Sequence, residues 1–234
     1  MIRFSHTIAS RSVALVAAML VLTPSLAAAE GQQRHPSDDS ATARGPQKLV
    51  DKAVSVVAEM DRDPKLHALV GRAAGIYIIP AYGQAGFLIG GRGGAGVAVA
   101  RTASGWSTPA FFSFGGLNIG LQAGGDGGSV VYLLMNRRAV SQFIDRTKIS
   151  LNANAGYAVV KYSDADQANL AKGDVIVWTN TKGAYAGATI EASGIHADDG
   201  RTREFYGRDL SPRAILNGQA SAPGARFLQQ ALAR

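Results

Sequence analysis

The sequence has no cysteine and only four histidines, so several kinds of chemistry are closed to it. Without cysteine it can form no disulfide, no thiolate metal site and no lipid-modified N-terminal cysteine. His6 and His35 lie in N-terminal segments that we place outside the folded domain, which leaves His67 and His196 as candidate bases. No G-x-S-x-G nucleophile motif accompanies them. A Ser-His-Asp hydrolase is therefore only a distant alternative.

The remaining polar candidates are equally sparse. GIHADDGR at 194–201 puts His196, Asp198 and Asp199 in one expected loop, where they would be at most a weak metal site of hard ligands, and a polar hairpin turn is the commoner explanation. We expect His67 to lie on the surface of a helix. Glu191 and Asp209 fit structural roles, such as pairing with Arg208 or Arg213. We expect no enzyme activity, no metal and no cofactor.

The first 29 residues have the features of a secretory signal peptide. A basic start precedes an apolar run over 13–22, and Ala27 and Ala29 stand in A-x-A spacing before Glu30. The run is well short of the roughly 20 residues that a membrane-spanning helix needs. We expect cleavage after Ala29 and a periplasmic or secreted protein that is not a lipoprotein. Removing Arg3 and Arg11 with this segment would lower the formal net charge from +7 to +5.

Polar residues 30–45 lack apolar periodicity and predict a disordered leader, after which the domain starts. Pro46 opens one helix, and Asp63 with Pro64 starts a second. Short apolar runs bounded by glycine or proline follow from Gly75 and predict strands. Helices are expected again at 136–146, after the cap residue Asn136, and at 211–217, whereas 219–234 is interpreted as a tail. This order predicts an α+β fold over 46–218, with a mostly antiparallel, strongly curved or barrel-like sheet, N-terminal helices, one inserted helix and a C-terminal helix.

A glycine-rich stretch at 87–101, FLIGGRGGAGVAVAR, matches the G-x-G-x-x-G spacing of a dinucleotide-binding turn. That site needs a helix after the glycines and an acid about 20 residues on. Here the glycines run into a strand pattern, and the next acid, Asp126, lies in a second glycine run. We interpret the echo of GGRGGAGV at 90–97 in GGDGGSVV at 124–131 as two structural turns, with Arg92 facing Asp126 as a possible ion pair. The turn residues are Gly90, Gly91, Arg92, Gly93, Gly94, Gly96, Gly124, Gly125, Asp126, Gly127 and Gly128.

Several blocks in a fixed order resemble one family. They are GIYIIP at 75–80, AGFLIGGRGGAGV at 85–97, Trp106, SFGGLNIGLQAG at 113–124, VVYLLMN at 130–136, GAYAGATIEASGI at 183–195 and EFYGRDLSPRAIL at 204–216. Together they resemble the SYLF domain, also known as the actin-patch-protein domain of fungi, over about residues 46–218. The resemblance implies binding of phosphoinositides and anionic membranes, and of actin filaments by the fungal members. Bacterial members of the family are exported, often as lipoproteins.

The resemblance also implies that the N-terminal helices contact the membrane. The candidate lipid-binding residues there are Lys48, Lys52, Lys65 and Arg72, of which Lys65 and Arg72 lie seven apart on one helix face. Arg137 and Arg138 form a further candidate pair. The alternative for all six is a solvated basic surface on helices that pack on the core.

We expect an exported, non-enzymatic domain that binds an anionic phospholipid membrane surface peripherally. Nucleic acid is not an expected partner, because no basic stripe carries interleaved aromatic residues. The alternative is an envelope or secreted protein-interaction module that uses an apolar groove between the helices and the sheet. Its protein partner is unknown.

Overall fold

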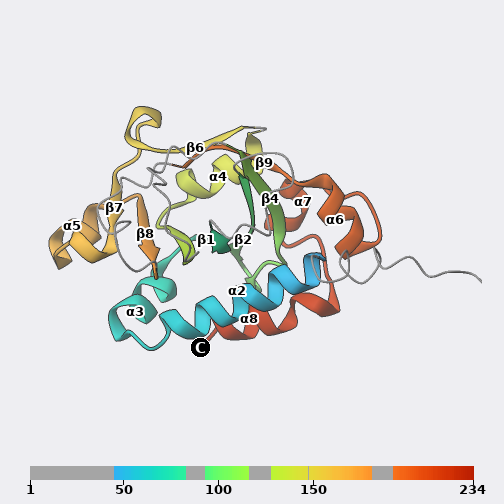
Figure 1. Cartoon of the computed structure of the whole chain (residues 1–234), viewed down its shortest axis with the longest axis horizontal. Helices are drawn as coiled ribbons and strands as arrows, with labels where there is room; N and C mark the ends of the chain where they lie inside the picture. The colour runs from blue at the N-terminus through green and yellow to red at the C-terminus, as the bar shows by residue number, and fades with distance from the viewer. Residues whose placement is uncertain (1–44, 83–92, 116–127, 147, 181–191) are drawn as a thin grey trace, which may run out of the picture. The chain divides into compact units, whose positions relative to one another are not determined.

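A computed structural model describes residues 45–82, 93–115, 128–146, 148–180 and 192–234. Its strands form a mostly antiparallel, strongly curved sheet in the order β6-β9-β4-β2-β1-β5-β8-β7, with β3 paired to β2 (Figure 1). Among the described strands, only the pair β7 and β8 is parallel. The strands are β1 (Gly75–Tyr82), β2 (Gly93–Thr102), β3 (Gly105–Trp106), β4 (Ala110–Gly115), β5 (Gly128–Leu134), β6 (Ile149–Leu151), β7 (Val159–Lys161), β8 (Val175–Thr179) and β9 (Ala192–Ala197). The predicted α+β class with a curved antiparallel sheet is confirmed.

Helices cover both faces of this sheet, which explains why its strands read as nearly continuous apolar runs. One face packs on α4 (Arg137–Asp145) and α7 (Pro212–Leu216). The other packs on α2 (Pro46–Met60), α3 (Pro64–Arg72) and α8 (Arg226–Leu232). Alternation along β1 divides its side chains between the two cores: Tyr77 belongs to the first cluster, and Ile76 and Ile78 belong to the second.

The helix starts follow the predicted capping residues. The Asp63 carboxylate accepts from the backbone N–H of Lys65 at 2.9 Å and begins α3. The Asn136 side chain accepts from the N–H of Ala139 at 2.9 Å and begins α4. Ser211 caps α7 in the same way. Each cap satisfies a backbone donor that the first turn leaves without a partner.

Besides α8, which is described below, two α-helices and one turn were not predicted. The polar helix α5 (Gln167–Lys172) begins at its cap Asp166, and α6 (Asp199–Tyr206) begins at Asp198, where the sequence suggested a hairpin loop. The strand-like stretch KISLNANAGYAVV at 148–160 divides into β6 and β7, with a 3-10 turn at Ala153–Ala155 between them that ends at Gly156 with φ 78°. The prediction of one inserted helix is therefore wrong. Short helices with few apolar residues give almost no periodic signal, although their aspartate caps were readable.

The glycines expected in a first turn lie partly in a strand. Gly93, Gly94 and Gly96 belong to β2 and pair with β4, and Gly128 begins β5. Gly96 is required by close approach, because a Cβ there would lie 2.6 Å from the Ile78 carbonyl oxygen and from the ring of Tyr77. The other turn residues, the pair Arg92 and Asp126 included, lie outside the described residues, as does Glu191.

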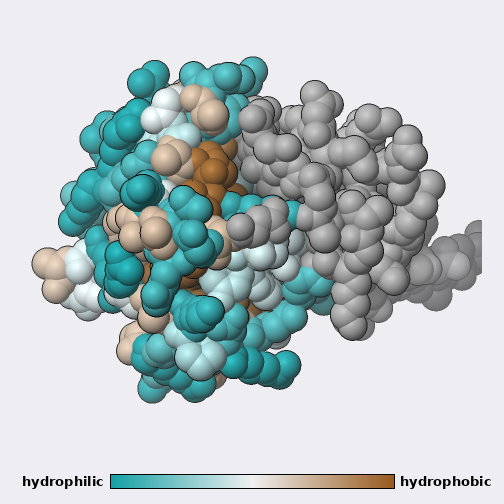
Figure 2. Space-filling model, turned by 90° about the vertical axis from the view of Figure 1, so that its left-hand side faces the viewer, coloured by the Kyte–Doolittle hydropathy of each residue, from teal (hydrophilic) through white to brown (hydrophobic). Residues whose placement is uncertain are grey.

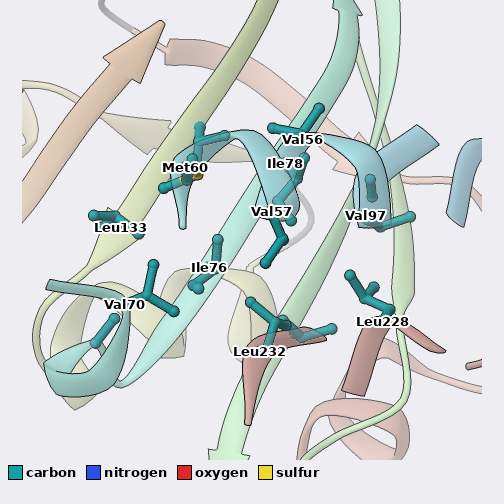
Figure 3. Close-up of a cluster of buried hydrophobic side chains, with 14 of the residues drawn as sticks. Val56, Val57, Met60, Val70, Ile76, Ile78, Val97, Leu133, Leu228 and Leu232 are labelled. Carbon is teal, nitrogen blue, oxygen red and sulfur yellow. The ribbon is translucent and has the colours of Figure 1, made fainter. Parts of the chain in front are cut away.

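The segment 219–234, interpreted from the sequence as a tail, is part of the fold. Its helix α8 packs along α2, with Leu228 fully buried and Leu232 only 2% exposed. Figure 3 shows both leucines pointing at a cluster supplied by α2, α3 and strands β1, β2 and β5. The Trp106 indole N–H also donates to the Leu232 carbonyl at 2.8 Å. The described domain therefore continues past residue 218 as far as α8.

None of the helices in the described ranges has the length and apolar character needed to cross a membrane.

Candidate functional site

An open groove lies between α3 and α5, at the end of the molecule that faces the viewer in Figure 2. Its volume is about 250 Å³. Leu69 and Leu170, 6% and 8% exposed, are its most buried lining residues, and Ala68 and Ala171 line it as small exposed side chains. Hydrophobic surface is recessed between hydrophilic side chains on this face (Figure 2). The groove thus offers an apolar floor that an outside ligand can reach.

Two of the predicted lipid-binding residues meet at this groove. Lys65 and Arg72 both line it from α3, and both are exposed. Neither side chain forms an ion pair with another described residue. The prediction that they share a helix face is confirmed, and the structure adds the apolar surface beside them.

The first turn of α3 is fixed to the chain that leads into α5. The Tyr162 hydroxyl donates to the Asp63 carboxylate at 2.6 Å, and Asp63 at the same time caps α3. This hydrogen bond, against a smaller effect of burial, holds the pKa of Asp63 below its ordinary value. Burial, reinforced by the bond to Asp63, raises the pKa of Tyr162 to about 12. One end of the groove is therefore held by a charge-assisted bond.

The last turn of α3 is held by Arg101 on β2. Its guanidinium donates to the carbonyls of Gly71 at 3.0 Å and Ala73 at 3.3 Å, which the helix end leaves without helical partners. The same guanidinium lies 4.4 Å from the ring centre of Trp106, whose indole is bonded to α8. Both ends of α3 are thus fixed to the rest of the fold.

The other predicted lipid-binding residues lie elsewhere. Lys48 is exposed and Lys52 is partly exposed on α2, and neither lines the groove. Arg137 is exposed at the start of α4. Arg138 has a structural role: its guanidinium donates to the Gly156 carbonyl at 3.0 Å and lies 4.7 Å from the ring centre of Tyr157. The six candidates do not form one surface.

The predicted polar candidates are engaged in structural contacts. His67 is 48% exposed and lies 3.3 Å from Asp61, which confirms its surface position. Asp198 caps α6 and accepts from Ser113 at 2.5 Å and from Arg201. Burial opposes its ionisation, but these hydrogen bonds outweigh burial and hold the pKa of Asp198 below its ordinary value.

The surface acids pair differently from the sequence hypothesis. Asp209 pairs with Arg203 at 2.7 Å rather than with Arg208 or Arg213, and Arg213 pairs with Asp145 at 2.6 Å. In the described part of the chain no three His, Cys, Asp or Glu residues come together as a possible metal site.

Sequence reasoning missed the α5 wall of the groove and the bond between Asp63 and Tyr162. Leu170 and Ala171 belong to a helix of six residues, too short to show a periodic stripe. Asp63 and Tyr162 are 99 residues apart, and no local pattern reports such a contact. The only signal was Asp166, a residue type that favours helix N-caps.

The described chain is thus an α+β domain with a groove whose floor is apolar and whose rim is cationic. Residues 115–234 match the family model Ysc84, described as "Las17-binding protein actin regulator", and the chain belongs to this family. The chain is 31% identical over 160 residues to Protein YSC84 of Saccharomyces cerevisiae, covering 66% of this chain and 34% of the relative.

Two further relatives support the same family membership. LAS seventeen-binding protein 3 of Saccharomyces cerevisiae is 32% identical over 162 residues, covering 66% of this chain and 35% of the relative. The human SH3 domain-containing YSC84-like protein 1 is 28% identical over 193 residues, covering 80% of this chain and 56% of the relative. The chain therefore spans between a third and somewhat more than half of these relatives' length, and the predicted family is confirmed.

Proposed function

We propose that this chain is a non-enzymatic binding domain that associates peripherally with anionic phospholipid membranes. The observation that carries the proposal is the exposed pair Lys65 and Arg72, which form no salt bridge with another described residue and stand beside apolar surface on α3. Basic residues next to apolar surface are the combination that peripheral membrane helices use. Among the described residues, Asp198 caps α6 and His67 lies exposed beside Asp61, so neither is proposed as a catalytic group.

The expected strength follows from the number of cations. Each Lys or Arg near an anionic surface contributes roughly 1 kcal/mol, so Lys65 and Arg72, with exposed Lys48 as a further contributor, support measurable and reversible attachment. The attraction falls off within a Debye length of about 10 Å at 0.1 M salt. Binding should therefore weaken as ionic strength rises.

The test is cosedimentation of the purified protein with vesicles at low and high salt. Phosphatidylcholine vesicles serve as the neutral surface, and vesicles of phosphatidylcholine and phosphatidylserine as the anionic one. We expect pelleting with the anionic vesicles only, reduced by salt. Equal pelleting with both compositions, or none with either, refutes the proposal.

A protein partner is the second candidate, favoured by the family. The family description and one relative's name both state Las17 binding, and the description adds actin regulation. If neither vesicle composition pellets the chain at low salt, this second candidate remains.

Export is a separate proposal that rests on the first 29 residues. If the segment is a cleaved signal, the mature protein begins at Glu30. N-terminal sequencing of the protein from the periplasm or culture medium tests this. A protein that stays in the cytoplasm with residues 1–29 attached contradicts it.

A further inference from the structure

The groove between α3 and α5 is recessed, whereas the proposed membrane attachment needs only the exposed cations and the apolar surface of α3 beside them. A bilayer surface is flat on this scale, whereas Leu69 and Leu170 lie at the bottom of a recess of about 250 Å³. The recess has room for one or two apolar side chains that project from a helix lying across it.

The lining is suited to close contact with a helix. Ala68 on α3 and Ala171 on α5 are exposed and small, so a third helix can approach both walls closely. The floor leucines then lie within reach of one or two large apolar side chains from that helix. These features favour an amphipathic helix laid in a groove, a recurring mode of peptide recognition.

The charges specify the polar side of the occupant. Lys65 and Arg72 are seven residues apart, which at 1.5 Å per residue separates them by about 10.5 Å along α3. Ala68 and Leu69 lie between them. A partner helix matches this spacing if it has acidic residues at positions i and i+7 and apolar residues at i+3 and i+4. Its charges are then opposite to those of Lys65 and Arg72.

The groove is also preformed, which lowers the cost of binding. The bond between Tyr162 and Asp63 fixes one end of α3, and Arg101 fixes the other. The carboxylates of Asp63 and Asp166 are both hydrogen-bonded within the fold, Asp63 to the Tyr162 hydroxyl and Asp166 to the N–H of Asn169 at 2.8 Å. Both keep their negative charge, so the attraction of Lys65 and Arg72 for an acidic ligand must exceed their repulsion.

We propose that the α3–α5 groove is a docking site for an acidic amphipathic helix of a protein partner. This goes beyond the proposed membrane binding but shares two of its cations, Lys65 and Arg72. The partner helix and an anionic membrane should therefore compete for the domain.

The probe is a synthetic helical peptide of about four turns, or ~14 residues. It carries two glutamates seven residues apart with two leucines between them, and its control has lysines in place of the glutamates. Binding is measured by fluorescence anisotropy with the full chain. We expect the acidic peptide to bind and to be displaced by anionic vesicles, and the basic control not to bind.

Groove-filling variants separate this inference from the proposed function. Ala68→Trp, from the α3 wall, and Ala171→Trp, from the α5 wall, should each weaken peptide binding at least about tenfold, a loss of roughly 1.4 kcal/mol. Ala58→Trp, at an exposed alanine of α2, is the matched control and should leave it unchanged. Pelleting with anionic vesicles should be the same for all three.

Three other results would each refute one of the two proposals. No peptide binding up to about 1 mM, with vesicle binding intact, overturns the helix site and leaves the membrane proposal standing. Peptide binding without vesicle binding supports the helix site and refutes the membrane proposal. If both groove-filling variants reduce vesicle pelleting as strongly as peptide binding, the groove holds a lipid chain and the helix site is wrong.

Discussion

Leu228 offers a direct test of whether α8 belongs to the folded core. Its side chain is fully buried in the cluster shared by α2, α3 and the sheet (Figure 3), whereas the preceding residue, Phe227, is 67% exposed. Truncating a buried leucine removes its transfer free energy and leaves a cavity, which together cost about 2–5 kcal/mol. For Leu228→Ala we expect a loss of about 3 kcal/mol, because the site is closed on all sides. At ~2–4 °C per kcal/mol this lowers Tm by roughly 6–12 °C.

Urea unfolding followed by tryptophan fluorescence measures the effect. Trp106 is a suitable reporter, since its indole N–H is bonded to α8 at Leu232. Phe227→Ala is the matched control and should change the free energy of unfolding by no more than about 0.5 kcal/mol. If Leu228→Ala costs less than ~1 kcal/mol, or no more than Phe227→Ala, then α8 does not pack as described.

Two further predictions test the sheet and the groove. Gly96→Ala should destabilise the protein by about 1–3 kcal/mol, because the new Cβ would overlap the Ile78 carbonyl oxygen. Gly71→Ala on α3 should instead stabilise the protein by up to ~1 kcal/mol, because its new Cβ would meet nothing within 4 Å. Equal changes in the free energy of unfolding, measured in urea, contradict this prediction. Tyr162→Phe should raise the pKa of Asp63 towards its ordinary value. The pKa of Asp63 is depressed in the folded state. The bond's contribution to the free energy of unfolding is therefore fully present above the unfolded-state pKa of about 3.9, and it is lost as the pH falls through the folded-state pKa. The difference in unfolding free energy between wild type and this variant should therefore stay constant from about pH 7 to pH 5 and narrow as the pH falls below about 4. A difference that stays constant at low pH argues against the bond.

The fold class was predictable because its signals are local. The caps Asp63, Asn136 and Ser211 begin helices where the sequence indicated, and the apolar runs from Gly75 onward form strands. Burial of the sheet on both faces also leaves a local sign in the sequence, because such strands lack polar residues at alternate positions. Each of these features depends on residues within a few positions of one another.

What escaped prediction depends on contacts between distant segments. Residues 219–234 were interpreted as a tail, and only the packing of α8 on α2 makes this segment part of the core. Likewise, Lys65 and Arg72 could be placed on one face from their spacing, but the groove beside them needs α5, about 100 residues later. Arg138 looked like a surface cation and proved to hold the turn at Gly156.

The proposed membrane role is tested most directly by a charge-matched pair of double variants on anionic vesicles. Lys65→Glu with Arg72→Glu removes the cations of the groove rim, and Arg146→Glu with Arg208→Glu makes the same change in net charge at exposed sites outside it. At roughly 1 kcal/mol per cation, the first pair should weaken binding to phosphatidylserine-containing vesicles at least ~30-fold, with little effect of the second. An equal loss in both would show that binding follows net charge alone and would contradict a membrane site on α3.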